Sequence, residues 1–341
     1  MDRLPTLFVA TAILAAISAP AQAQPSIEDH FRGKTLTVII PTSPGGDRSA
    51  NALALINHIG RHIPGNPRVV PAYMPGAGGL SALNQLANVV AKDGLTIATP
   101  LTTLIVAQVT GDQAVRYDVS KMNWIGRTSE STQVVYVWHK VPVQNLDDAK
   151  QREVSLGSTG VNSPSTIIPL IMNNVFGTKF KIVLGYKGSA DFNLATARGE
   201  TDASLTTWSN LRNTHADIVR DKQARILFQV LMTRHPELAD VPTAFELATN
   251  DDDRALIEFM TSSAELGQAF IAPPDVPAPI IETLRRAFDL TMQDAAYIAY
   301  SKKVGNALTP LPGAELARFV AKTLATPKSV IDRYTAAVAV R

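Results

Sequence analysis

The sequence predicts an α/β fold built from two lobes with a cleft between them. Short apolar segments suited to strands alternate with segments of helical periodicity along most of the 341-residue chain. The chain is also long enough for about two domains. Two loops that contain glycine and hydroxyl residues, 41–46 and 158–163, each follow a predicted strand and precede a predicted helix. Each lobe can therefore direct one helix N-terminus towards a shared cleft.

Residues 1–23 have the pattern of a cleaved secretory signal peptide. Arg3 precedes an apolar run at residues 7–19, and the small residues Ala21 and Ala23 end it. That run is too short to span a bilayer, and no later segment reaches the roughly 18 apolar residues that a spanning helix needs. We therefore expect the mature protein to be exported.

Composition excludes several classes of site and partner. The chain has no cysteine, so neither a disulfide nor a thiolate metal site is possible. Its formal net charge is only +2, and lysine and arginine are dispersed among nearly as many acidic residues. This pattern does not favour a polyanionic partner, so we expect no nucleic acid to bind.

The first predicted strand and helix frame an anion site. Residues 35–40 form the strand, and apolar residues at i, i+3, i+4, i+7 and i+11 predict one buried helical stripe after the loop. The free N–H groups and the positive dipole end of the first helical turn suit an anion. Gly45 and Gly46 would let a ligand approach the backbone. The stripe consists of Ala52, Leu55, Ile56, Ile59 and Ile63.

Further strands and helices alternate along the rest of the chain. A helix after the proline-rich segment 273–277 has an apolar stripe, and a last helix is expected at residues 314–324. The stripe consists of Ile281, Leu284, Phe288 and Met292. Strands are expected at residues 68–72, 96–98, 134–138, 154–157, 181–184, 203–205 and 225–230.

The second loop repeats the arrangement of the first. Ser163 is the predicted N-cap of the helix that follows it, and Pro164 is the predicted first helical residue. Pro169 should kink or shorten that helix. A single loop of this kind usually serves only to turn a strand into a helix. Two of them in an exported chain with two lobes favour a ligand site.

Nine short motifs occur in series along nearly the whole mature chain. They include Pro44-Gly45-Gly46 in the first loop and Met74-Pro75-Gly76 after the second strand. The motifs lie at residues 33–39, 44–46, 62–67, 74–79, 92–94, 185–188, 198–202, 240–243 and 272–277. In order and approximate spacing they resemble the solute-binding receptors of the tripartite tricarboxylate transporter family.

The resemblance implies a two-lobed periplasmic binding protein with a type II-like arrangement, in which helices flank mixed central sheets. Lobe 1 would comprise residues 24–132 and 254–341, and lobe 2 residues 133–253. The protein would act in the periplasm as a monomer, capture a small carboxylate in the cleft and deliver it to a two-component membrane permease. Mono-, di- and tricarboxylates, aromatic acids and an uncharged amide all stay open as the ligand. No cofactor, metal ion or catalytic activity is expected.

The resemblance also implies the walls of the site. The family holds its carboxylate largely through backbone N–H groups, hydroxyls and ordered waters from the two loops. By position, the first wall would be Thr42, Ser43, Gly45 and Gly46, and the second wall would be Ser158, Gly160 and Ser163.

The first helical turn departs from the family pattern. Ser49 stands where the family usually has an aspartate, and Asp47 and Arg48 place two charges beside the loop. Two interpretations of Arg48 stay open. Its guanidinium could grip a ligand carboxylate as a bidentate fork, or it could face solvent and pair with a neighbouring acid such as Asp47.

Four more residues near strand ends are candidates for ligand contact. Trp208 follows Thr207 where the second lobe should face the cleft, and its ring could stack on an apolar ligand body. The hydroxyl of Tyr186 could donate to a carboxylate, and Thr102 follows a strand end in the first lobe. For Trp208 and Tyr186, ordinary packing within the lobe is an equal alternative.

Other functions have weaker support in the sequence. The segment 76–81 lacks the last glycine of a dinucleotide-binding motif, and no serine lies in a nucleophile elbow. His58 and His62 lack the glutamate of a catalytic zinc helix, so a solvated helix face is the better hypothesis. Two rivals remain: an exported sensor for a membrane kinase, and an exported hydrolase or isomerase that uses the same cleft.

Overall fold

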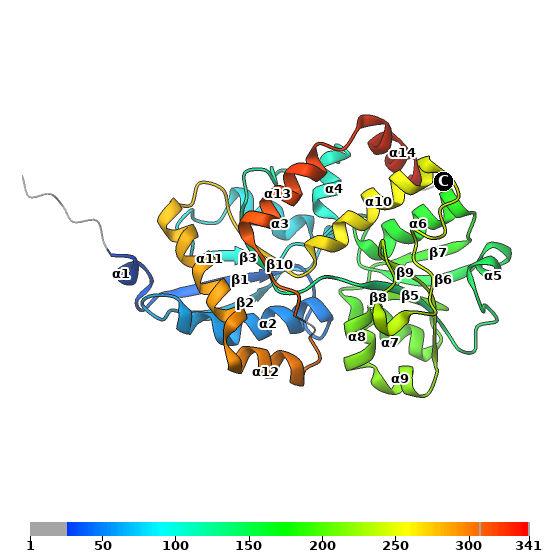
Figure 1. Cartoon of the computed structure of the whole chain (residues 1–341), viewed down its shortest axis with the longest axis horizontal. Helices are drawn as coiled ribbons and strands as arrows, with labels where there is room; N and C mark the ends of the chain where they lie inside the picture. Colours follow the sequence, from blue (N-terminus) through cyan, green and yellow to red (C-terminus); the bar gives the residue numbers. More distant parts are fainter. Residues whose placement is uncertain (1–25, 307, 340–341) are drawn as a thin grey trace, which may run out of the picture.

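Two mixed β-sheets, each flanked by helices, form two lobes that lie side by side (Figure 1). The computed structural model describes residues 26–306 and 308–339. The predicted signal peptide, residues 1–23, lies outside the described residues. The arrangement confirms the predicted α/β class and the two-lobed architecture.

The first sheet has six strands in the order β11-β4-β10-β3-β1-β2. Strand β1 pairs in parallel with both β2 and β3, while β10 runs antiparallel between β3 and β4. The loop before α2 therefore leaves the carboxyl end of a central parallel strand, which is the usual edge for a ligand in an open α/β sheet. The strands are β1 Thr35–Ile40, β2 Arg68–Tyr73, β3 Thr96–Ala98, β4 Asn123–Arg127, β10 Ala269–Ala272 and β11 Leu311–Pro312.

The second sheet has five strands in the order β7-β6-β8-β5-β9. Strand β6 pairs in parallel with β7 and β8, and β5 runs antiparallel to β8 and β9. The second predicted loop follows β6, so it also lies at the carboxyl edge of parallel strands. The strands are β5 Gln133–Trp138, β6 Val154–Ser158, β7 Phe180–Leu184, β8 Ala203–Thr207 and β9 Ala224–Val230.

Helices cover both sheets. The predicted apolar stripe of α2 is buried in the first lobe, where Leu55 and Ile59 pack with Leu36 and Phe288. The α-helices are α1 Ile27–Phe31, α2 Asp47–Ile59, α3 Leu80–Asn88, α4 Leu104–Val109, α5 Leu146–Gln151, α6 Pro164–Phe176, α7 Ser189–Arg198, α8 Trp208–Thr214, α9 Ala216–Arg220, α10 Asp251–Leu266, α11 Ala278–Gln293, α12 Ala295–Lys303, α13 Gly313–Leu324 and α14 Lys328–Val338. Short 3-10 helices occur at Gly60–His62, Ala77–Gly79 and Pro236–Leu238.

The chain passes between the lobes from α13 to α14, and also in two adjacent segments, one from β4 to β5 and one from α10 to β10. They pair with each other, because the Gln268 N–H donates to the Ser129 carbonyl (2.9 Å) and the Thr128 N–H donates to the Gln268 carbonyl (3.2 Å). Gly267 has φ +46°, and a Cβ there would lie 2.0 Å from the Ser129 carbonyl oxygen. The close approach of the crossing segments therefore requires glycine at this position.

The C-terminal helix packs on the second lobe (Figure 1). Tyr334 of α14 and Leu256 of α10 are buried in the same cluster as Val135 and Leu156 of the second sheet. The helix α14 and most of α10 belong to the segment 254–341 that the sequence assigned to lobe 1. The predicted lobe boundaries at residues 132 and 254 stay a prediction.

Several observed elements differ from the expected ones. Strands β4, β10 and β11 were not predicted, because β4 contains glycine and arginine, β10 is only four residues long and runs into a proline, and β11 has only two residues. Helix α14 follows the helix that was expected to be last. Pro169 does not end α6, which continues to Phe176.

The histidine hypothesis is wrong in one respect. His58 and His62 do not lie on a solvated face, because both are partly buried beneath α12. His58 Nδ1 bonds with the Ala54 carbonyl and its ring contacts Tyr297, while His62 Nε2 bonds with Asp294 Oδ2 at 2.8 Å. Within residues 26–306 and 308–339, no group of three potential metal ligands occurs, and no helix is long and apolar enough to cross a membrane.

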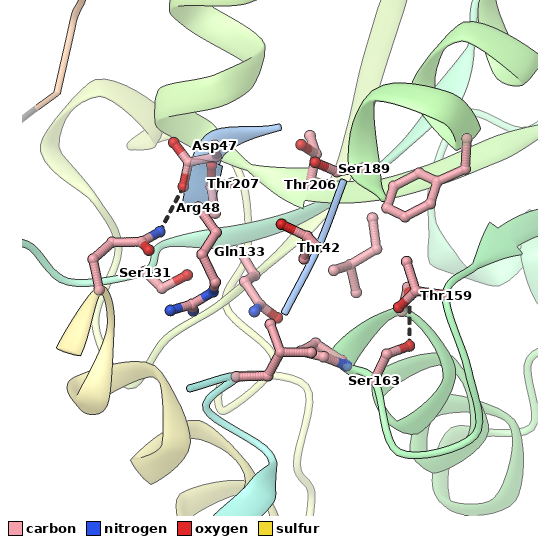
Figure 2. A pocket seen from close by; sticks show the side chains of 16 residues that line it. Thr42, Asp47, Arg48, Ser131, Gln133, Thr159, Ser163, Ser189, Thr206 and Thr207 are labelled. Carbon is pink, nitrogen blue, oxygen red and sulfur yellow. Dashed lines mark hydrogen bonds between the residues drawn. The ribbon is translucent and has the colours of Figure 1, made fainter. Parts of the chain in front are cut away.

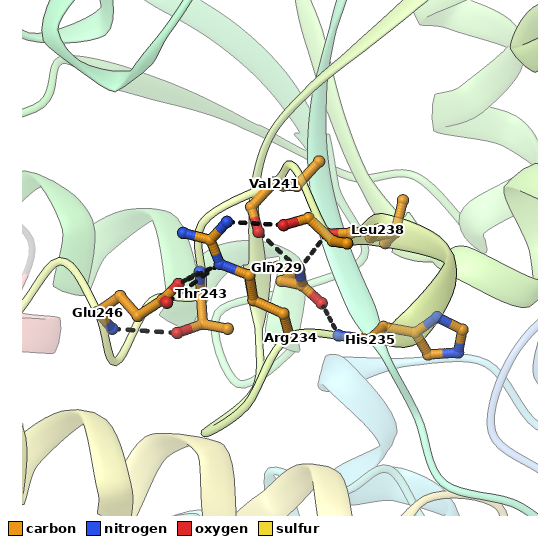
Figure 3. Close-up of polar contacts among 8 residues, drawn as sticks. Gln229, Arg234, His235, Leu238, Val241, Thr243 and Glu246 are labelled. Carbon is orange, nitrogen blue, oxygen red and sulfur yellow. Dashed lines mark hydrogen bonds and ion pairs between the residues drawn. The ribbon is translucent and has the colours of Figure 1, made fainter.

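A buried amide orders the segment after β9 in the second lobe (Figure 3). Gln229 is fully buried, and its Nε2 donates to the carbonyls of Leu238 (3.0 Å) and Val241 (2.7 Å). Its Oε1 accepts from the backbone N–H of His235 (2.8 Å). This amide thus holds the segment that contains the motif at residues 240–243.

Replacing Gln229 with leucine should lower the free energy of unfolding by about 3 kcal/mol, because three backbone groups that are buried or partly buried lose a hydrogen bond. Urea denaturation of the two proteins measures the difference. Gln113→Leu is the matched control, since Gln113 is exposed and should change stability by less than about 0.5 kcal/mol. Equal stability of the Gln229 and Gln113 variants would contradict the assigned role.

Candidate functional site

A cavity of about 100 Å³ lies between the lobes, where the first turn of α2 faces the end of β8 and the start of α6 (Figure 2). Its lining is rich in hydroxyl and amide groups from both lobes. Asp47 and Arg48 are the ionisable side chains among the described residues that line it. Other lining residues are Thr42, Ser131, Gln133, Thr159, Ser163 and Ser189, together with Phe192, Leu205, Thr206, Thr207 and Gln268.

Arg48 brings a buried positive charge to this cavity. Its side chain is 9% exposed; Nη1 donates to Thr99 Oγ1 (2.9 Å) and Nη2 donates to the Gly267 carbonyl (3.2 Å). Burial lowers the pKa of Arg48 to about 10, while the nearby Asp47 charge acts in the opposite direction. The guanidinium thus stays charged at neutral pH. No carboxylate oxygen of the described residues lies within 4 Å of it, and three of its five N–H groups have no hydrogen-bond partner among those residues.

Asp47 uses its carboxylate to join the lobes. Its Oδ1 accepts from the Ser209 hydroxyl of α8 (3.1 Å), and its Oδ2 accepts from Gln268 Nε2 (2.7 Å). Burial raises the pKa of Asp47, against the lowering effect of these hydrogen bonds and of Arg48. Asp47 therefore pairs with hydroxyl and amide donors rather than neutralising Arg48 through a direct ion pair.

Two polar atoms near the cavity have no partner. Thr42 Oγ1 and Gln268 Oε1 are both buried, and neither forms a hydrogen bond within the part of the chain that the structure describes. Buried polar atoms are satisfied in most proteins, so atoms of this kind in a cleft indicate a place for a ligand or for ordered water.

The lobes touch each other beside the cavity, and glycines lie at the contacts. A Cβ on Gly160 would lie 2.7 Å from the Gly78 nitrogen, and a Cβ on Gly46 would lie 2.6 Å from Ser189 Oγ. The Thr103 hydroxyl donates to the Asn162 carbonyl across the same boundary. The structure is therefore that of lobes in close contact, with backbone against backbone at Gly78 and Gly160.

In a comparison with protein-family models, residues 60–335 match the family described as "Tripartite tricarboxylate transporter family receptor". The chain belongs to this family of transporter receptors. A comparison of the sequence with curated proteins finds no significant match.

Solved structures of low sequence identity share the fold of this receptor. The periplasmic binding protein BugD is 16% identical with a TM-score of 0.69, over 89% of this chain and 97% of its own. MatC from Rhodopseudomonas palustris, with bound malate, is 19% identical with a TM-score of 0.68, over 90% and 99%. An R. palustris protein with adipate is 17% identical with a TM-score of 0.68, over 89% and 97%.

Four of the expected site residues of this receptor line the cavity: Thr42, Arg48, Ser163 and Thr207. The solvent-facing interpretation of Arg48 is wrong, since its side chain is buried. Ser163 occupies the predicted N-cap position, but its hydroxyl donates to the Gly160 carbonyl (2.8 Å) instead of capping the helix. The N–H groups of the first turn of α6 thus stay free of a side-chain cap.

The other loop residues expected in the walls support the cavity from behind or lie between the lobes. Ser158 is fully buried, and its hydroxyl bonds with those of Ser163, Ser165 and Thr166. Gly160 lies against Gly78. The remaining three, Ser43, Gly45 and Gly46, face residues 187–190 of the second lobe.

Three of the candidates near strand ends do not line the cavity. Trp208 packs in a cluster with Tyr136 and Trp138, and its indole N–H donates to Glu237 (2.6 Å). Tyr186 contacts the ring of Phe192, which does line the cavity. Thr102 lies beside a small apolar space within the first lobe.

Gln133, Gln268 and Asp47 were not expected at the site. Gln133 begins β5, and Gln268 follows α10, so both lie where the crossing segments pass the cleft. The sequence did contain a signal for Gln133, because the chain was expected to leave lobe 1 near this residue. No local sequence pattern predicts that Gln268 lies at the cleft.

Proposed function

We propose that the protein is a periplasmic solute-binding receptor that captures a small carboxylate between its lobes and delivers it to a two-component membrane permease. It binds its ligand without chemical turnover. The family match supports the receptor role, and the malate and adipate found in the two Rhodopseudomonas palustris structures support the ligand class.

The observation that carries the proposal is the Arg48 guanidinium. A buried cation without an anionic partner is costly, and hydrogen bonds from a charged donor are stronger than those from a neutral one. A carboxylate in the cavity would supply the missing charge and accept N–H groups from the same side chain. The Ser165 N–H in the first turn of α6 and the Thr42 hydroxyl would then fix the ligand from the two lobes.

Binding would be coupled to closure. A ligand that contacts both lobes stabilises their closed arrangement over an open one, and a membrane partner can distinguish the two. The contacts from Asp47 to Ser209 and from Thr103 to Asn162 already connect the lobes. Closure thus would join ligand capture to recognition by the permease.

A thermal-shift screen against aliphatic and aromatic carboxylates tests this function. A ligand that binds only the folded state stabilises it by about 2.7 kcal/mol at a hundredfold excess over its Kd, so a selective rise in Tm is expected. The ligand should be recovered unchanged. No shift with any carboxylate, or recovery of an altered ligand, would contradict the proposal.

A further inference from the structure

We infer that the ligand has a hydrogen-bond donor, a hydroxyl or an amine, next to its carboxylate, and that Gln268 recognises this donor. The inference rests on the proposed function and specifies its ligand. It comes from one polar atom, Gln268 Oε1, which is buried in the cavity wall without a partner among the described residues.

The orientation of the Gln268 amide is fixed by Asp47. The Gln268 amide presents its NH₂ group to Asp47, because Nε2 donates to Asp47 Oδ2 at 2.7 Å while Asp47 Oδ1 accepts from the Ser209 hydroxyl. The carbonyl Oε1 then faces away from Asp47. Because Oε1 can only accept, a ligand group that satisfies it has to be a donor.

The backbone of Gln268 does not supply a donor for Oε1. Its N–H donates to Ser129 and its carbonyl accepts from Thr128, so both backbone groups are already paired in the crossing segment. The residue is 3% exposed. The residue is therefore anchored by its backbone in the crossing segment.

Gln268 and Arg48 line the same cavity, and the guanidinium contacts the chain next to Gln268. Arg48 Nη2 donates to the carbonyl of Gly267, the residue immediately before Gln268. A carboxylate on the guanidinium would thus bring a substituent on its neighbouring carbon towards Gln268. The geometry fits a 2-hydroxy or 2-amino acid better than the corresponding unsubstituted acid, which would leave Oε1 unpaired.

Matched acids test the inference with the unmodified protein. Binding of malate is compared with succinate, and lactate with propionate, by titration calorimetry; aspartate and alanine distinguish an amine from a hydroxyl donor. In at least one series the substituted acid should bind about 10- to 100-fold more tightly. Equal affinity across every series would overturn the inference but leave the receptor function standing. Absence of binding by all of these acids, and by the wider carboxylate panel, would overturn both.

Two variants locate the effect. Gln268→Met removes the acceptor at similar volume, so the preference for the substituted acid should fall to less than about 3-fold. Gln113→Met, the same change at an exposed site, should keep the full preference. A preference that persists in folded Gln268→Met would overturn the role of this residue. The melting temperature of the variant establishes whether it is folded. If it does not fold, the comparison of matched acids with the wild-type protein still tests the inference.

Discussion

Arg48→Met is expected to weaken carboxylate binding by about 100-fold or more. The substitution removes two or more charge-assisted hydrogen bonds, each worth about 1.5 to 3 kcal/mol, and 2.7 kcal/mol corresponds to a factor of 100 in Kd. The loss is large because the side chain is 9% exposed and water cannot replace it easily.

Titration calorimetry with the best acid from the screen measures this effect. Arg318→Met is the matched control, because the Arg318 side chain is 77% exposed and does not line the cavity. Arg48→Lys should be intermediate, since it keeps the charge and loses the planar fork. An unchanged Kd for Arg48→Met would remove Arg48 from the ligand site.

The same substitution should change the stability of the ligand-free protein little, because removal of a buried charge offsets the loss of the hydrogen bonds to Thr99 and the Gly267 carbonyl. Burial lowers the pKa of Arg48 to about 10, so the folded state binds this proton less tightly than the unfolded chain does. The charge therefore disfavours folding at every pH below about 10. Loss of affinity together with retained stability would separate a binding role from a structural one.

Local patterns predicted the framework of the site well. The stripe after residues 41–46 became the buried face of α2, and Ser163 and Pro164 begin α6 as expected. Such features depend on periodicity and capping, which are written in neighbouring residues. The two loops at the cleft could therefore be located from sequence.

Contacts between distant segments could not be predicted in the same way. Gln268 meets Asp47 across a separation of 221 residues, and nothing near Gln268 indicates that its amide faces the cleft. Trp208 shows the opposite limit. Its place at a strand end suggested a ligand contact, but it begins α8 and its ring turns into the core beside Tyr136. Which face a side chain takes at such a junction depends on tertiary packing.

Gly160→Ala should prevent complete closure and weaken ligand binding by about 10-fold or more. The added Cβ would lie 2.7 Å from the Gly78 nitrogen, a contact between backbones of opposite lobes that no side-chain rotation can relieve. Gly160 does not need the left-handed conformation, so alanine fits its own backbone. Folding of each lobe should therefore be unaffected, and only the closed arrangement should suffer.

Small-angle scattering with and without ligand, together with Kd, distinguishes this effect from a lost ligand contact. Wild-type protein should become more compact when ligand binds, and Gly160→Ala should show a smaller decrease in radius of gyration. Val161→Ala, a change at an exposed neighbour in the same loop, should behave like wild type. Normal compaction of Gly160→Ala would show that the lobes can close without a glycine at this contact. An unchanged affinity would show in addition that ligand capture does not depend on the approach of Gly160 to Gly78.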